Sequence, residues 1–422
     1  MILQNLSKRA ESLDTIDALS HLVDDFCLPA DCIYLDGNSL GPLPLSAKQR
    51  AREVVELQWG DDLITSWNKH AWISLPQRVG AKIAPLLGSL PEQVIACDSI
   101  SVNLSKVLCA ALNIQQHSST QRNVVISQQD NFPTDLYMVQ GLSELVGPQR
   151  CSLISVPENK ILSAIEEYAD TAAVLMLTHV NFRSGRIHDM QAITKAAHAK
   201  GILVIWDLAH SAGVLDLELD KCEVDFAVGC TYKYLNGGPG APAFIYAAKR
   251  HWDDIKQPLS GWMGHKKPFD FAHDYSVADG MTRFLVGTPP VVSMSILDAA
   301  LDTFDGISTK QIRAKSVSLT QFFQDAFNAL IEDKRFTLIT PNEHALRGSQ
   351  LAFSHPQAYA ICQALIAHKV IADFRAPDIL RIGFSPLFLT HKQLLDAVLR
   401  LKEVLDTEQY LLAEFQTKQA VT

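Results

Sequence analysis

Short apolar runs alternate with helical patterns between about Val94 and Tyr246, and this alternation constrains the fold more than any other feature. Five of the runs are typical of strands: NVVISQQ, AAVLMLTHV, GILVIWDLA, VDFAVGCTY and PAFIYAA. The helical pattern MQAITKAAHAKG is expected to end at Gly201. Because the strands are apolar along their length, helices should cover both faces of their sheet. The sequence therefore predicts an α/β fold with a largely parallel sheet.

The pattern changes after residue 310. Leu319, Phe323, Phe327 and Leu330 share one face of a predicted helix, which two short strands follow. Thr390 and Gln393 have the spacing of a capping box at the start of a long closing helix. We therefore expect a smaller α+β domain over residues 311–422, a large α/β domain over residues 46–310, and an N-terminal arm over residues 1–45 that begins with a helix.

Composition limits the class of partner. The chain has 422 residues, of which 47% are hydrophobic, so it can bury a large core. Its formal net charge of −9 argues against a nucleic acid or an anionic membrane surface as the main partner. The first residues, MILQNLSKRAESLDT, lack the pattern of a signal peptide, and no apolar run approaches the roughly 18 residues of a membrane span. We expect a cytoplasmic protein with a small-molecule ligand.

The cysteines do not indicate a metal site. The chain has eight, without a C-x-x-C pair or a histidine at zinc-binding spacing. We expect reduced thiols and no bound metal. The glycine-rich NGGPG at residues 236–240 matches neither the dinucleotide-binding fingerprint nor the P-loop.

Two ionisable side chains follow apolar strands. Asp207 ends one predicted strand, and Lys233 follows the next. The carboxyl ends of neighbouring parallel strands lie at one edge of a sheet, so both side chains are expected in one cleft. Alone, Asp207 could be a helix N-cap and Lys233 a solvated lysine. Together they fit pyridoxal phosphate (PLP), which needs an acid to keep its ring nitrogen protonated and a lysine to bind its aldehyde.

Longer motifs carry a family resemblance. YLDGNSLGPLP, NFPTD, WDLAHSAG, CTYKYLNGGPGAPAFIY, LSGWMGH and GTPP follow one another between residues 34 and 290, and ILRIGFSPLF lies near the C-terminus. In this order they resemble the motifs of kynureninases, PLP enzymes of fold type I and of the class-V aminotransferase-like family. The resemblance implies PLP-dependent hydrolysis of the Cβ–Cγ bond of L-kynurenine to anthranilate and L-alanine in tryptophan breakdown. It also implies a homodimer with shared active sites.

The resemblance also implies roles for single residues around the cofactor. Lys233 would bind the cofactor covalently and move the substrate's α-proton, Asp207 would pair with the ring nitrogen, and Tyr232 would assist proton transfer at the substrate carbonyl. The other positions assigned to the cofactor are Phe132 and Asp135 at the ring, His210 beside Asp207, and Ile100, Ser101, Thr178, Trp262 and Thr288, largely around the phosphate. Without the resemblance, Phe132 and Trp262 would be read as packing residues. CTYKYLNGG holds no cation besides Lys233, so hydroxyls, an indole and backbone N–H groups are expected to hold the phosphate.

Four further positions are implied for the substrate. Arg381 matches the arginine that binds the α-carboxylate, for which the rigid fork of a guanidinium is suited. A surface ion pair is the alternative for Arg381, although its apolar neighbours favour a strand that points it inward. Ser39, Trp67 and Asn68 match other substrate-binding positions. Animal enzymes that prefer the 3-hydroxylated substrate have histidine and asparagine where this chain has Thr65 and Thr288, which predicts a moderate preference for L-kynurenine.

Two alternative functions stay open at this point. Cysteine desulfurases share the D-x-A-H motif and the later lysine, but they need a nucleophilic cysteine on a mobile loop. The only cysteine after Cys230 is Cys362, in the helical pattern AYAICQALIAH. A non-catalytic PLP-binding regulator would usually carry a basic helix-turn-helix segment, and none precedes residue 40.

Overall fold

A seven-stranded sheet forms the centre of the protein. The computed structural model describes residues 1–119 and 121–418. The strand order is β4-β10-β9-β8-β7-β5-β6. Five strands run parallel, namely β5 (Val124–Gln128), β6 (Ser152–Val156), β7 (Ala172–Thr178), β8 (Leu203–Asp207) and β9 (Phe226–Gly229). The prediction of a mostly parallel sheet is confirmed, but β10 (Phe244–Ala247) runs antiparallel to both β9 and β4 (Val94–Ala96).

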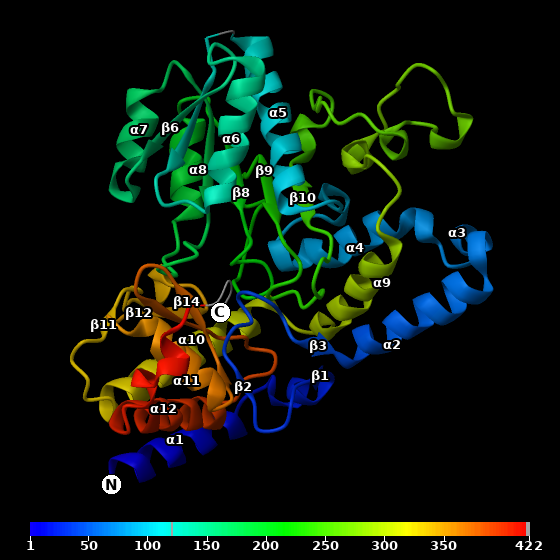
Figure 1. The fold of residues 1–422 in the computed structure, drawn as a ribbon. Coiled ribbons are helices and arrows are strands. Elements are labelled where there is room, and N and C mark those ends of the chain that lie inside the picture. Colours follow the sequence, from blue (N-terminus) through cyan, green and yellow to red (C-terminus); the bar gives the residue numbers. More distant parts are fainter. Residues whose placement is uncertain (120, 419–422) are drawn as a thin grey trace.

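Helices cover both faces of this sheet (Figure 1). On β7, Val174 and Met176 pack into one apolar cluster and Leu175 and Leu177 into the other, as the alternation of side chains along a strand requires. The first cluster includes residues of α5 (Ile100–Ser118) and α6 (Pro133–Val146), and the second includes residues of α7 (Ile161–Glu167) and α8 (Met190–His198). Gly201, at φ +67°, ends the turn after α8, so the predicted helix end is confirmed.

A second, antiparallel sheet lies in the C-terminal part, in the order β11-β12-β15-β14. Its strands are β11 (Thr337–Leu338), β12 (Gln350–Ser354), β14 (Asp373–Arg375) and β15 (Ile379–Gly383), and its helices are α10 (Thr309–Leu330), α11 (Ala358–Ala367), α12 (His391–Asp406) and α13 (Ala413–Gln416). The predicted capping box is present at α12: Gln393 N–H donates to Thr390 Oγ1 at 3.2 Å, and Thr390 N–H donates to Gln393 Oε1 at 3.0 Å. The sequence predicted two strands in this region, whereas this sheet has four; β11 and β14 are only two and three residues long.

The N-terminal segment joins the two sheets. It contains α1 (Ile2–Thr15), β1 (Phe26–Cys27), β2 (Ile33–Tyr34), β3 (Leu43–Pro44), α2 (Leu45–Glu53), α3 (Ser66–Lys69) and α4 (Leu75–Ile83). Figure 1 shows α1 beside α12, and β2 pairs in parallel with β13 (Val370–Ile371), while β1 pairs with β3. Further along, α2 packs against α9 (Val291–Ala300). Between β2 and β3, the Leu35 carbonyl accepts the Gly383 N–H and the Gly41 N–H donates to the Tyr232 carbonyl, so this stretch runs from the end of β15 to the turn after β9.

Neither a membrane-spanning helix nor a metal-binding cluster occurs among the described residues. Among the described residues, no helix combines the length and the apolar composition that a membrane span requires. Over the same ranges, no cluster of three or more histidine, cysteine, aspartate or glutamate side chains is arranged to hold a metal ion.

Candidate active site

Strand ends bring the central site residues together. Thr178 is the last residue of β7 and pairs in register with Asp207, the last residue of β8. Lys233 lies in the turn that follows β9, and its charge acts on both Asp135 and Asp207. Asp207 is buried at 3% exposure, although it lies at the edge where ligands of such sheets bind.

Asp135 and Asp207 form a buried carboxyl pair. A side-chain hydrogen bond links the two groups, and the Thr178 hydroxyl lies 3.2 Å from Asp135 Oδ2. Burial, and next the Asp207 charge, raise the pKa of Asp135 well above its usual range. Asp135 therefore holds a proton and donates it towards Asp207, whose Oδ1 accepts the Ala209 N–H at 2.7 Å. The pair carries one negative charge, and no cationic side chain of the described residues forms an ion pair with Asp207.

His210 lies beside the lysine. Its Nε2 lies 2.9 Å from Lys233 Nζ, and its imidazole is buried at 4% exposure. Burial, and next the Lys233 charge, lower the pKa of His210 well below its usual range, so the ring is neutral and Nε2 accepts from the ammonium. His210 Nδ1 then carries the remaining hydrogen, and it has no partner among the described residues.

Unpaired polar atoms concentrate around the same cleft. Apart from His210 Nδ1, the described residues leave several other buried atoms without a partner there: Asp36 Oδ1, both amide atoms of Asn38, Asn236 Oδ1 and Arg375 Nε. A Cβ atom on Gly41 would lie 2.3 Å from the Lys233 carbonyl oxygen, so the N-terminal arm approaches the lysine turn as closely as a glycine allows. Buried polar groups without partners are unfavourable, so this concentration indicates a polar ligand.

Tyr232 and the start of α5 are the groups predicted to bind the phosphate. Ile100 and Ser101 form the first turn of α5, and Ser99 caps this helix by accepting the Val102 N–H at 3.4 Å. Backbone N–H groups at a helix start attract anions. Lys233 Nζ lies 5.9 Å from the centre of the Tyr232 ring, and burial raises the pKa of Tyr232, so its hydroxyl stays protonated.

Phe132 keeps an exposed aromatic face. It precedes α6, is 40% exposed, and packs edge-on against the ring of Phe182 at 5.2 Å between centroids. The Phe182 carbonyl oxygen also accepts a hydrogen bond from Arg381 Nη1 at 2.6 Å. Phe132 is therefore not a core residue, and through Phe182 it is connected to the arginine expected to bind substrate.

Arg381 is more fully engaged than the sequence predicts. It is buried at 1% exposure, Nε donates to Asp373 Oδ1 at 2.9 Å, and Nη2 donates to the other oxygen of that carboxylate and to Ser39 Oγ at 2.9 Å. The contact with Phe182 leaves one of its five N–H groups free. Among the described residues, Arg381 therefore has one N–H group left for a substrate carboxylate, and its role in substrate binding stays a prediction. Arg375 joins the cluster, with Nη2 at 2.7 Å from Asp373 Oδ2 and 3.2 Å from Ser39 Oγ.

Sequence reasoning missed Asp373 and Arg375. Both lie on β14, which is only three residues long, and their alternation in DFR on one side of that strand was the available signal. The nearby Asp36 was missed as well. Burial, and next the Asp373 charge, raise the pKa of Asp36 to about 7.

Four predicted residues lie apart from this cleft in the single chain. Trp67 and Asn68 belong to α3, where the Trp67 ring packs edge-on against Trp72. Trp262 packs against Phe269 and Phe271 in a loop region that Figure 1 shows extending away from the ends of β8 and β9, as α3 also does. Among the described residues, no hydrogen bond or ring contact joins Trp67, Asn68, Trp262 or Thr288 to Lys233 or Arg381.

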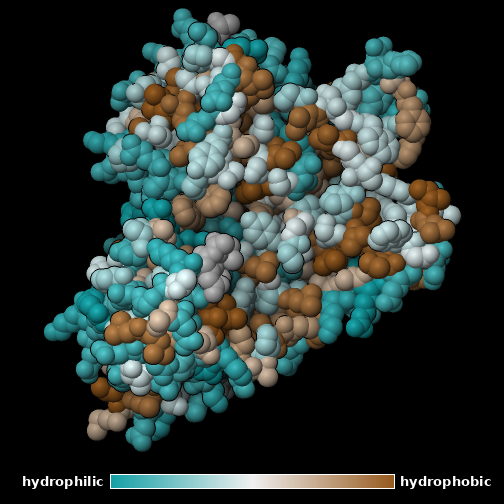
Figure 2. All heavy atoms as spheres, in the orientation of Figure 1, coloured by the Kyte–Doolittle hydropathy of each residue, from teal (hydrophilic) through white to brown (hydrophobic). Residues whose placement is uncertain are grey.

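Exposed apolar side chains gather on these two outlying segments. On the side where α2, α3 and α9 lie, Figure 2 shows a large apolar surface. The exposed side chains of the two segments are Val55, Leu57, Trp59, Leu63, Ile64, Leu259, Trp262, Phe269, Phe271, Tyr275 and Val277. Apolar surface of this extent is typical of protein–protein contacts.

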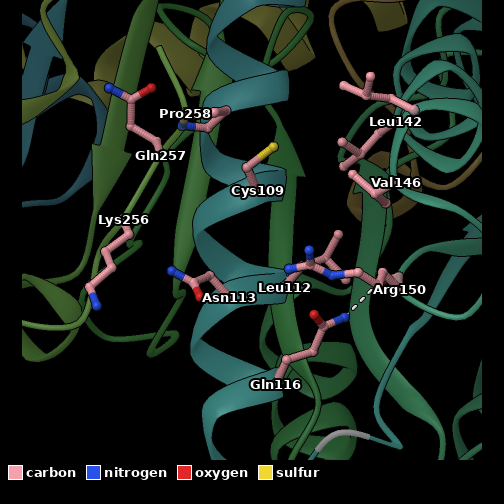
Figure 3. Close-up of a pocket in the computed structure, with 11 residues that line it drawn as sticks. Cys109, Leu112, Asn113, Gln116, Leu142, Val146, Arg150, Lys256, Gln257 and Pro258 are labelled. Carbon is pink, nitrogen blue, oxygen red and sulfur yellow. Dashed lines mark hydrogen bonds between the residues drawn. The ribbon is translucent and has the colours of Figure 1, made fainter. Parts of the chain in front are cut away.

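A separate cavity of about 360 Å³ lies between α5, α6 and residues 256–258 (Figure 3). Its lining includes Cys109 and Leu112 from α5, Leu142 from α6, and the cationic Arg150 and Lys256. None of the residues predicted for the active site lines it. Burial raises the pKa of the Cys109 thiol, so this cysteine is a poor nucleophile.

Comparisons with known proteins agree with the motifs. The sequence profile described as "Kynureninase C-terminal domain" matches residues 312–401. The chain is 46% identical over 420 residues to a kynureninase of Burkholderia mallei (strain ATCC 23344), covering 98% of this chain and 99% of that one. It is 44% identical over 412 residues to a kynureninase of Pseudomonas fluorescens, covering 97% and 98%.

Solved structures with the same fold are more distant in sequence. The apo cysteine desulfurase of Thermococcus onnurineus NA1 superposes with a TM-score of 0.76 at 18% identity, over 92% of this chain and 98% of that one. A cysteine desulfurase of Escherichia coli gives 0.74 at 17% identity, over 94% and 99%. These two likenesses confirm the predicted fold of type I and nothing finer. The relatives at 44–46% identity match almost end to end, and the chain belongs to the kynureninase family.

Proposed function

We propose that this chain is a PLP-dependent hydrolase that cleaves the Cβ–Cγ bond of L-kynurenine to give anthranilate and L-alanine, in the cytoplasm and in tryptophan breakdown. One structural observation is the main support for the proposal. The buried carboxyl pair of Asp135 and Asp207 carries one negative charge, Asp207 forms no ion pair among the described residues, and the Lys233 charge acts on both groups. Relatives named kynureninase over nearly the full length supply the reaction class.

The residues of the cleft fit PLP. Asp207 offers a buried negative charge to a protonated ring nitrogen, and the ring would compensate the cost of burying that carboxylate. Lys233 offers an amine to the aldehyde, and the unpaired His210 Nδ1–H is available to an oxygen of the ring. The first turn of α5 suits the phosphate. When bound, PLP supplies the electron sink for carbanion chemistry at the substrate's α-carbon.

The protein's own groups account for binding and proton transfer. Arg381, held by Asp373, and the neighbouring Arg375 and Ser39 bind the substrate carboxylate. Lys233 Nζ takes the α-proton, and His210 beside it accepts a hydrogen bond from the ammonium. Tyr232 keeps its proton and can donate it to the substrate's γ-carbonyl oxygen as water adds there.

A desulfurase-type reaction is not supported by the one late cysteine. Cys362 lies in α11 with no exposed surface, and its thiol donates to the Ala372 carbonyl oxygen at 3.5 Å. Burial raises the pKa of this thiol, which removes the thiolate that such a nucleophile requires.

We propose a homodimer in which each chain completes the other's cleft. Trp67, Asn68, Trp262 and Thr288 lie on or beside segments with exposed apolar side chains, which a second copy would cover. Within one chain, the arm of residues 1–45 and the domain of residues 311–422 bring Ser39 and Arg381 to the large domain of residues 46–310.

The proposed substrate preference follows from Thr65 and Thr288. Neither position offers the histidine and asparagine expected for a 3-hydroxyl group, so we propose that L-kynurenine is preferred and 3-hydroxy-L-kynurenine is turned over more slowly. A pocket without dedicated hydrogen-bonding groups discriminates only about 10–200-fold. A higher kcat/KM for the hydroxylated substrate would contradict this preference.

Product analysis tests the proposed reaction. The protein loaded with PLP is incubated in parallel with L-kynurenine and with L-cysteine, and products are separated by chromatography. We expect anthranilate and L-alanine in equal amounts from L-kynurenine and no sulfide from L-cysteine. Sulfide release without anthranilate would instead support a desulfurase.

A further inference from the structure

Lys106 is a fully buried lysine that the proposed reaction does not use. It lies on α5, two turns after Ile100 and Ser101, and its side chain has no exposed surface. Its ammonium donates to Asp98 Oδ2 at 2.5 Å and to the Phe284 carbonyl oxygen at 2.5 Å, and Cys97 Sγ lies 4.0 Å away. Side chains on a helix tilt towards its N-terminus, so Lys106 reaches back to the turn that precedes α5.

The first contact fixes the turn before the proposed phosphate site. Asp98 has φ +44°, a left-handed conformation that is uncommon for a residue with a side chain. Its backbone carbonyl accepts the Ala243 N–H at 2.7 Å, and the side chain of Asn103 donates to the Cys97 carbonyl at 2.7 Å. The Lys106–Asp98 ion pair therefore holds a backbone conformation that leads directly into Ile100 and Ser101.

The second contact fixes the segment that leads to Thr288. Phe284 has no exposed surface, and the Val286 carbonyl two residues further on holds the turn of Trp262. Met263 N–H donates to the Val286 carbonyl at 3.2 Å, and a Cβ on Gly261 would lie 2.1 Å from that oxygen. One ammonium group thus connects the start of α5 with the segment carrying Trp262 and Thr288.

We infer that Lys106 is a positioning residue that holds two proposed phosphate-binding segments of its own chain in a fixed relation. One is the turn at Ile100 and Ser101, which belongs to the chain's own cleft, and the other is the Trp262 and Thr288 segment, which the proposed dimer brings to the second copy's cleft. This inference rests on the proposed function, because it needs PLP as the ligand. A buried ion pair often adds little to stability compared with apolar residues of similar size, so positioning is the contribution that the geometry supports.

The test compares the affinities for PLP and for pyridoxal, which lacks the phosphate. In Lys106→Met the side chain keeps its length and loses its ammonium. We expect the ratio of PLP affinity to pyridoxal affinity to fall about tenfold, because only the phosphate loses well-placed donors. Both affinities are measured by fluorescence titration of the apoprotein and need no turnover.

Lys315→Met is the matched control. Lys315 is also buried, at 5% side-chain exposure, and pairs with Asp17 at 2.6 Å, but both lie in the N-terminal arm and α10. This variant should lose stability and keep the wild-type ratio. Asp98→Asn is the second variant, since asparagine tolerates a positive φ and leaves the Phe284 contact in place. We expect its ratio to fall about threefold, and it decides the question if Lys106→Met does not fold.

The outcomes separate the two proposals. A lower ratio in Lys106→Met and Asp98→Asn with an unchanged ratio in Lys315→Met supports the inference. An unchanged ratio in the folded Lys106 and Asp98 variants overturns it, as does an equal fall in Lys315→Met. If the wild-type protein itself does not bind PLP in preference to pyridoxal, the proposed function fails together with the inference.

Discussion

Lys233 Nζ lies 2.9 Å from His210 Nε2, at the edge of a sheet whose strands are otherwise apolar. The neutral imidazole accepts from the ammonium, and burial keeps the imidazole neutral because it lowers the pKa of His210. The lysine is thus held in place beside the Asp135 and Asp207 pair. In the proposed function, Lys233 is the amine that attaches PLP covalently.

Covalent labelling tests that assignment. After PLP is added and borohydride reduces the adduct, peptide mapping is expected to find the label on Lys233. Lys106 is the internal comparison, because it is a buried lysine whose donors are already engaged. A label on any other lysine would show that the assignment is wrong.

Replacing the charged Asp207 should impair the reaction far more than replacing its protonated neighbour Asp135. We expect Asp207→Ala to lower kcat/KM by about 10²–10³, because the charge facing the ring nitrogen is removed. Asp135→Asn should stay within about tenfold of wild type, since an amide still donates to Asp207. Steady-state kinetics with L-kynurenine at saturating PLP gives both values.

Asp225→Asn is the control for this pair. Asp225 is a buried carboxylate at the opposite end of the sheet, where His198, His251 and Arg250 surround it. Its loss should lower stability and leave kcat/KM near the wild-type value. A similar loss of kcat/KM in Asp225→Asn and Asp207→Ala would indicate a general effect on folding instead.

Replacing Asp373 should raise KM for the substrate and leave kcat nearly unchanged. In Asp373→Ala the Arg381 guanidinium loses the carboxylate that orients it, so we expect KM for L-kynurenine to rise about tenfold while kcat changes little. Kinetics over a range of substrate concentrations separates the two constants. A fall in kcat at unchanged KM would place Asp373 in the chemistry instead.

Buried histidines should make the fold sensitive to mild acid. Burial, and next the His188 charge, lower the pKa of His179 to about 3. In the unfolded chain this group binds a proton below about pH 6.5, whereas in the folded chain it stays neutral, so its contribution to stability is present above pH 6.5 and is lost as pH falls. The free energy of unfolding should therefore drop by about 2 kcal/mol per such histidine between pH 7.5 and 5.

His179→Gln tests the origin of this effect. Glutamine does not titrate, and it can still contact Ser211, which lies 2.9 Å from His179 Nδ1. Urea unfolding at both pH values should show a smaller drop for the variant than for wild type. Equal drops in the two proteins would exclude His179 as a source of the acid sensitivity.

The central sheet was predictable because five of its strands are uniformly apolar. Once the sheet is predicted, residues that follow its parallel strands are expected at one edge. Asp207 and Lys233 were found in this way. The Arg381 environment was only partly predictable, because Asp373 and Arg375 lie on a three-residue strand and meet Ser39 from the far end of the chain. The reversed direction of β10 was missed, since an apolar run carries no information on strand direction.

The proposed dimer accounts for the positions of Trp67 and Trp262, which contact neither Lys233 nor Arg381 among the described residues. Family motifs identified their segments, and in the proposed dimer a second copy would supply their contacts with the cleft. Sedimentation at assay concentrations is expected to show a dimer, and an active monomer would contradict the shared site.

The most direct test of the central claim follows anthranilate fluorescence after L-kynurenine is added to the PLP-loaded protein, with Lys233→Ala treated identically. We predict continuous anthranilate formation by the wild-type protein and none above background by the variant, with both proteins folded. Equal anthranilate formation by both, or none by a wild-type protein that holds PLP, would contradict the account.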